Sequence, residues 1–160
     1  MRAAANRDEE QPQPVICTKS IAVKSTHVDN SFETISFTVN GKSVGKPRMT
    51  RRDQWIKRPC VLRYRDYCDR IRSAAGSIPP NPDKIQVVVY IAVPKSWSKK
   101  KKAEMDEKPH RSKPDADNLL KAVVDGMFKE DSCIWSKLIE KFWCQPGEER
   151  TEIRVLYQRP

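Results

Sequence analysis

The chain has 160 residues, enough for one domain with a hydrophobic core and too few for two comfortable ones. It carries 31 Lys and Arg residues against 21 Asp and Glu, a formal net charge of +10, which favours a polyanionic partner. No apolar run approaches the roughly 20 residues that a membrane-spanning helix needs, and the first thirteen residues lack the apolar stretch of a secretory signal. Nucleic acid is therefore a better partner than a membrane.

The five cysteines form no CxxC pair, and the only histidines are His27 and His110. The ligand spacing of a zinc site is absent. An odd number of cysteines also argues against a disulfide framework. We expect reduced cysteines in a cytoplasmic protein.

Residues 1–32 are polar and mixed, and we expect a mobile tail there, with an added edge strand near 15–23 as the alternative. The domain is expected at 33–160. Polar and apolar residues alternate over 34–39, which predicts a strand, and Asn40-Gly41 marks a turn. Residues 41–72 contain eleven Lys or Arg and three Asp. Within them, 45–52 is expected to be a loop and 60–75 an amphipathic helix with arginines on its exposed face.

Prolines at 79, 80 and 82 end this helix. The β-branched run 85–93 predicts a central strand buried on both faces. Ser96 is a candidate N-cap for a short helix reaching about 105, a second helix is expected at 117–127, and strands follow at 133–143 and 151–157. The order β-α-β-α-α-β-β indicates an α+β fold, a mixed or antiparallel sheet of about four strands with helices packed on it.

The most informative segment is Lys113-Pro114-Asp115-Ala116-Asp117-Asn118-Leu119-Leu120-Lys121, followed by Asp125 and Asp131. On a helical wheel Leu120, Val123, Val124 and Met127 form an apolar stripe, whereas Asn118, Lys121 and Asp125 lie on nearly the opposite side. Two aspartates at i and i+2, with a third from an adjacent element, supply the oxygen ligands that Mg²⁺ prefers.

Each residue of this segment also has a simpler explanation when taken singly. Asp115 or Asp117 suits a helix N-cap, Asp125 suits a solvated helix face, and Lys121 suits a surface ion pair with either neighbour. The metal-site interpretation depends on all of them converging.

Lys113-Pro114-Asp115-x-Asp117-Asn118-Leu119-x-Lys121, then Asp125, then Glu130-Asp131-Ser132, resembles the signature of the RusA family of Holliday junction resolvases. Gly45-Lys46-Pro47-Arg48 and its basic loop are similar to the upstream segment of many phage-borne members. The resemblance spans about 35–157. Two departures are visible: Glu130 stands where aspartate is frequent, and the stretch from Asp125 to Asp131 is shorter than in some members.

The resemblance implies a homodimeric, Mg²⁺-dependent endonuclease, with Mn²⁺ as a substitute, that cuts four-way DNA junctions by paired symmetrical nicks. It places the metal-binding aspartates at Asp115, Asp117 and Asp131 and the catalytic lysine at Lys121, with Asp125 and Glu130 in supporting positions. DNA phosphates are expected to contact the basic residues of the motif and the loop: Lys46, Arg48, Arg51, Arg52 and Lys113.

Trp55 and Tyr64 admit two interpretations, as aromatics that stack on bases at the junction centre or as core or dimer-contact residues. Two other functions also remain open for the whole chain. One is a non-catalytic DNA-binding protein, in which the carboxylates only cap and solubilise. The other is a broader nuclease of branched DNA.

Overall fold

A computed structural model describes residues 31–56 and 58–159. The tail expected at 1–32 lies almost wholly outside the described residues. The domain forms around a four-stranded sheet of order β1-β4-β2-β3. The strands are β1 (Phe32–Asn40), β2 (Lys84–Ala92), β3 (Ser136–Cys144) and β4 (Arg150–Gln158). β4 runs antiparallel to both β1 and β2, and β2 runs parallel to β3. The expected α+β fold with a mixed sheet is confirmed.

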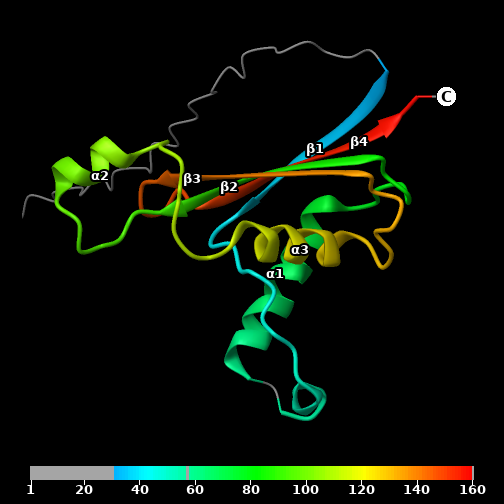
Figure 1. Ribbon diagram of the computed structural model, residues 1–160, viewed down its shortest axis with the longest axis horizontal. Helices are drawn as coiled ribbons and strands as arrows, with labels where there is room; N and C mark the ends of the chain where they lie inside the picture. Colours follow the sequence, from blue (N-terminus) through cyan, green and yellow to red (C-terminus); the bar gives the residue numbers. More distant parts are fainter. Residues whose placement is uncertain (1–30, 57, 160) are drawn as a thin grey trace, which may run out of the picture.

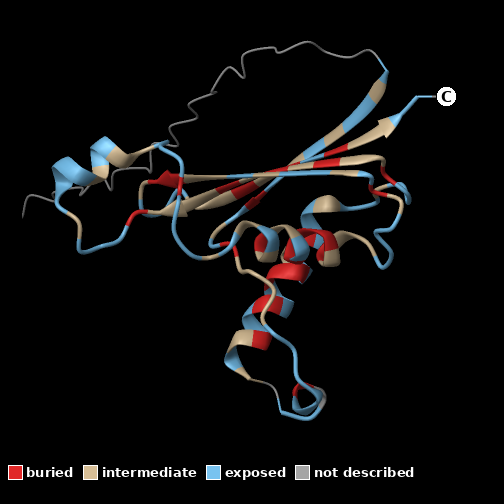
Figure 2. Ribbon diagram, in the orientation of Figure 1, coloured by how far each residue is buried: buried red, intermediate tan, exposed pale blue. Residues whose placement is uncertain are grey.

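Two helices, α1 (Pro59–Ala75) and α3 (Ala116–Met127), pack on the same face of the sheet (Figure 1). Pro59 suits the first turn of α1, where its missing N–H costs no hydrogen bond, and Gly76 ends the helix at φ +61°. The buried residues concentrate between the helices and the sheet (Figure 2). The largest fully buried side chains there include Tyr67, Ile71, Ile85, Leu119 and Ile153.

Two short helices lie outside this core. The 3-10 helix η1 (Arg51–Gln54) precedes α1, and α2 (Lys99–Met105) follows β2 and buries none of its residues. Ser98, whose hydroxyl accepts a hydrogen bond from Lys101 N, caps α2 in place of the expected Ser96. None of the helices in the described residues is long and apolar enough to cross a membrane.

The prediction that 85–93 is buried on both faces is wrong. Ile85, Val87 and Val89 are buried, whereas Val88 and Tyr90 on the opposite face are partly exposed. The physical reason is that α1 and α3 cover one face only, and no described helix covers the other (Figure 1). Apolar composition alone therefore overstated how deeply this strand is buried.

The buried stripe of α3 also differs from the expected one. Leu119, Ala122, Val123 and Gly126 are buried together with Val124, whereas Leu120 and Met127 are only partly buried. A Cβ added at Gly126 would lie 3.1 Å from Ile71 Cβ. The small residues of α3 face α1 because they let the two helices approach closely.

Candidate active site

The N-terminus of α3 presents the acidic motif to solvent. Asp115 is the N-cap residue, yet its side chain makes no capping hydrogen bond, and it is exposed. Asp117 is exposed in the first turn, where Lys121 Nζ lies 3.2 Å from its Oδ2. The simple capping explanation therefore does not account for Asp115, and the expected Asp117–Lys121 pair is formed.

A strap of chain before α3 holds these residues in position. Residues 107–110 pair with β3: Glu107 N donates to Trp143 O (3.0 Å), Trp143 N to Lys108 O (2.9 Å) and His110 N to Lys141 O (2.8 Å). His110 is 4% exposed and packs against Trp143 in a tilted arrangement, with ring centroids 3.9 Å apart and ring planes at 44°. Its burial, and then the nearby charge of Lys141, lowers the pKa of the His110 imidazole. The neutral ring therefore packs as part of the strap.

Lys141 of β3 fixes the last residues of the strap. Its Nζ donates to Ser112 O (2.9 Å) and to Pro114 O (2.7 Å), immediately before Asp115. A single ammonium thus joins the sheet to the chain entering α3. Sequence reasoning missed this residue, because nothing in the local pattern links Lys141 to a motif 27 residues away.

Asp125 faces α1 and the basic loop. Tyr64 of α1 donates its hydroxyl to Asp125 Oδ2 (2.5 Å), and Lys46 Nζ lies 2.7 Å from the same oxygen. Burial, followed by this hydrogen bond, raises the pKa of the Tyr64 phenol well above its ordinary value, so Tyr64 stays a donor at neutral pH. Asp125 is therefore a half-buried carboxylate with two protein partners, rather than one that only water surrounds. Tyr64 is 7% exposed and belongs to the core, the second of the interpretations given above.

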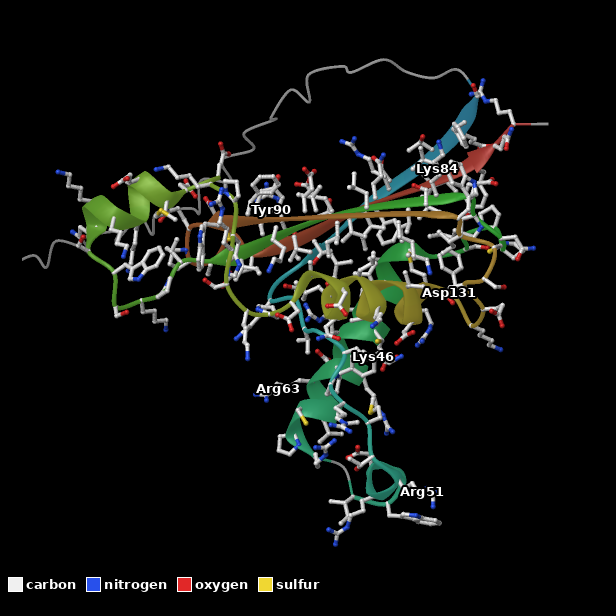
Figure 3. All side chains as sticks on the ribbon, in the orientation of Figure 1. Lys46, Arg51, Arg63, Lys84, Tyr90 and Asp131 are labelled. Carbon is white, nitrogen blue, oxygen red and sulfur yellow. The ribbon has the colours of Figure 1, made fainter. Side chains whose placement is uncertain are left out.

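The basic loop lies directly against α3. Lys46 N donates to Asn118 O (2.9 Å), and the Cβ position of Gly45 is 3.3 Å from Asn118 Cβ, which leaves little room for a larger side chain. Lys46, which lies beside α3 (Figure 3), is consequently part of the acidic site and pairs with Asp125. Its expected role as a free phosphate contact stays a prediction.

Asp131 lies in the loop between α3 and β3 (Figure 3), where it pairs with Lys137. The hydrogen bond from Lys137 lowers the pKa of the Asp131 carboxyl, and the charge of Lys46 acts in the same direction. Glu130 is exposed beside Asp131, and its carboxylate accepts a hydrogen bond from Ser132 N (3.4 Å).

Three of the five acidic residues of the motif are therefore carboxylates paired with a lysine. Among residues 31–56 and 58–159, no three His, Cys, Asp or Glu side chains are grouped closely enough to hold a metal ion. Asp117, Asp125 and Asp131 pair with Lys121, Lys46 and Lys137, respectively. The carboxylate oxygens are the donors that Mg²⁺ prefers, so the residues suit this cation by type. Their convergence on one ion stays a prediction.

The remaining residues expected to bind DNA are all accessible. Lys113 is exposed two residues before Asp115. Arg48, Arg51 and Arg52 are exposed on the segment that leads to α1, which projects away from the sheet (Figures 1 and 3). Their contact with phosphate stays a prediction.

An exposed acidic helix start with lysines beside it is suited by charge to a protein that binds both a cation and a polyanion. A model of the endodeoxyribonuclease RusA family matches residues 40–156. The chain is also 32% identical over 139 residues to the uncharacterized protein YqaN of Bacillus subtilis (strain 168), an alignment that covers 78% of this chain and 96% of that protein.

The chain belongs to the RusA endodeoxyribonuclease family. It is therefore an enzyme of the Holliday junction endodeoxyribonuclease class, and branched DNA is its partner.

Proposed function

We propose that this enzyme resolves four-way DNA junctions by paired, symmetrical, Mg²⁺-dependent nicks, using Asp115, Asp117, Asp131 and Lys121. One observation supports it above the others: Asp115 and Asp117 stand exposed at the start of α3, and Asp115 makes no capping bond, while Lys121 lies one turn further along. The net charge of the chain is +10, which attracts DNA. The exposed carboxylates of Asp115 and Asp117 can then bind a cation that in turn contacts a phosphate of the DNA.

Asp115, Asp117 and Asp131 would hold Mg²⁺, with Asp125 and Glu130 in support. The bound cation would acidify a water molecule and polarise the scissile phosphate. With the cation held there, one carboxylate of the site would orient a water for in-line attack on phosphorus. The P–O bond opposite the water would break, the proton of the water would pass to solvent, and the leaving oxygen would take up a proton from solvent. Lys121, which lies 3.2 Å from Asp117, offsets the extra negative charge that builds on the phosphate oxygens. Asp131 now pairs with Lys137, so it would have to give up this partner in order to hold the cation.

Two symmetrical nicks need two active sites. The enzyme therefore acts as a homodimer in this scheme, and the two-fold axis of the dimer matches that of the junction. Arg48, Arg51, Arg52 and Lys113 hold the arms through phosphates, and Lys46 joins them where DNA approaches Asp125. We also propose that the enzyme acts in the cytoplasm. In the part of the chain that the structure describes, Cys60, Cys68, Cys133 and Cys144 are all unbridged, as a reducing compartment requires.

The decisive experiment compares cleavage of a synthetic four-way junction by the parent enzyme, by Asp117→Asn and by Asp69→Asn, with and without Mg²⁺. Asp69 is an exposed carboxylate of α1 paired with Arg72, so it matches the loss of one charge away from the site. Asp117→Asn should abolish cleavage and leave junction binding intact or stronger, and Asp69→Asn should cut at the parent rate.

Cleavage at the parent rate by Asp117→Asn would show that the site assignment is wrong. Equal cutting of junctions, flaps and linear duplex by the parent enzyme would instead show a broader nuclease. Binding without any cleavage in Mg²⁺ or Mn²⁺ would show a non-catalytic DNA-binding protein.

A further inference from the structure

Residues 48–56 form an arm that projects from the domain on the way from the basic loop to α1, with η1 at its tip (Figure 1). In Figure 3 Lys46 lies at the foot of the arm, beside α3, and Arg51 lies at its far end. The hydrogen bond from Lys46 N to Asn118 O attaches the foot to the first turns of α3. The position of the tip is therefore set relative to the candidate catalytic aspartates.

The arm has its own hydrogen-bonded core around Asp53, whose side chain is only 5% exposed. This carboxylate accepts from Thr50 N (2.6 Å), from Thr50 Oγ1 (2.9 Å) and from Arg58 Nε (2.5 Å) and Nη2 (2.7 Å). Arg58 also donates to Arg48 O (2.9 Å), across the base of the loop. Because these bonds favour the ionised form, the pKa of the Asp53 carboxyl falls well below its ordinary range.

Asp53 is the only acidic residue between 34 and 65, and its charge is fully engaged inside the arm. The exposed arginines of the tip, Arg48, Arg51 and Arg52, therefore have no carboxylate of their own segment left to pair with. The arm presents an uncompensated positive charge, which suits a phosphate backbone.

The same tip exposes large apolar side chains. Trp55 is 85% exposed, Ile56 54% and Met49 43%. Leaving an indole in water on a well-bonded loop is unfavourable unless the indole has a partner. An aromatic ring flanked by arginines is the combination that binds nucleobases removed from the helical stack, since the ring stacks on the base while the guanidinium groups hold the neighbouring phosphates.

We infer that this arm reads the branch point of its DNA substrate: Trp55 stacks on a nucleobase exposed where the arms of the junction diverge, and Arg51 and Arg52 bind the flanking phosphates. The inference rests on the proposed function, because it requires a branched substrate. The arm's attachment to α3 then sets the distance between the captured base and the cut, so Trp55 is a positioning and specificity residue.

The test measures binding of the full-length protein to a four-way junction and to a linear duplex of equal length, in buffer without divalent cations. Trp55→Ala should weaken junction binding about tenfold, about 1.4 kcal/mol, and change duplex binding less than about twofold. Trp55→Phe should keep most of the affinity. The matched control is Trp135→Ala, since Trp135 is also exposed, at 65%, but lies outside the arm; it should bind both DNAs as the parent does.

A second readout places the contact. Junctions carrying 5-iododeoxyuridine at the branch point should photo-crosslink to Trp55, whereas the same base placed in the middle of an arm should not. In Mg²⁺, Trp55→Ala should also spread the cut over several positions, because the base that sets the distance is no longer held.

These measurements distinguish failure of the proposed function from failure of the inference about Trp55. If the parent enzyme binds junction and duplex equally, the proposed function fails and the inference, which requires a branched substrate, is overturned with it. If the parent prefers the junction but Trp55→Ala binds and crosslinks as the parent does, the inference alone is overturned. Equal weakening on junction and duplex would show a general DNA contact. Loss of dimer mass in Trp55→Ala by light scattering would show a contact between copies of the chain.

Discussion

Lys141 offers the sharpest test of how the fold positions the site. The change Lys141→Met keeps most of the aliphatic length and removes the ammonium, which donates to Ser112 O at 2.9 Å and to Pro114 O at 2.7 Å. Both carbonyls belong to the segment that ends at Asp115. The substitution should therefore loosen the chain that enters α3 while leaving α3 itself formed.

The magnitude follows from these two bonds. A hydrogen bond from a charged donor is worth about 1.5–3 kcal/mol when buried, and each of these is partly solvated, so roughly 1 kcal/mol or less is expected from each. The free energy of unfolding should fall by about 1–2 kcal/mol, and Tm by about 2–4 °C for each kcal/mol lost. A displacement of Asp115 of about 1 Å would lower the cleavage rate on the order of 100-fold.

The assay is single-turnover cleavage of a four-way junction at saturating enzyme, with binding measured separately by fluorescence anisotropy. Lys141→Met should lose cleavage and keep junction affinity to within about a factor of three, since one phosphate contact at most is removed. The control is Lys100→Met, which removes the same charge from the exposed helix α2 and should match the parent in rate and Tm. Parent-like cleavage and Tm for Lys141→Met would refute the positioning role.

Three further predictions concern the packing behind the site and its pH response. Tyr67 and Thr151 are fully buried and share a hydrogen bond of 2.8 Å. Tyr67→Phe should therefore lower the free energy of unfolding, measured in urea, by about 1–3 kcal/mol. Adding Thr151→Val should recover part of this loss, because no buried hydroxyl is then left unpaired. Gly126→Ala should lower the free energy of unfolding by about 1 kcal/mol. The new Cβ meets Ile71 and the rigid backbone of α1, and this overpacking outweighs the gain in helix propensity. A rise in the urea midpoint would contradict this prediction. The pKa of His110 is lower in the folded protein than in the unfolded chain, so the unfolded chain takes up a proton at a higher pH than the folded protein does. The free energy of unfolding should therefore decrease as the pH falls through about 6.5 towards the folded pKa. His110→Gln should flatten this slope when urea midpoints are compared across that pH range.

Much of the fold could be predicted from local patterns. The alternation over 34–39, the β-branched run 85–93 and the helical spacing around Tyr64 each fixed an element that the structure contains, because period and propensity act within a few residues. The candidate site was visible for the same reason. Asp115, Asp117 and Lys121 are neighbours along one helix start, so their spacing alone brings Lys121 to Asp117.

The prediction of which α3 residues are buried failed because side-chain size, and not only hydrophobicity, decides which residues face α1. Leu120 was expected in the buried stripe, but Ala122 and Gly126 occupy it because they permit the close approach of α1. A scale that counts only apolar character ranks leucine above glycine and cannot include the shape of a partner helix that is distant in sequence. The second face of β2 was misjudged for a related reason, since whether a helix covers it depends on the arrangement of the whole sheet.

The sequence by itself therefore determined the element types, the positive charge and the acidic motif, all properties of short segments. The tertiary structure alone decided the strand order β1-β4-β2-β3 and the surroundings of each carboxylate. Tyr64 reaches Asp125 across 61 residues, and Lys46 and Lys141 join the site from a loop and a strand. Such contacts arise only when the core closes, because burial brings together side chains whose separation along the chain carries no local signal.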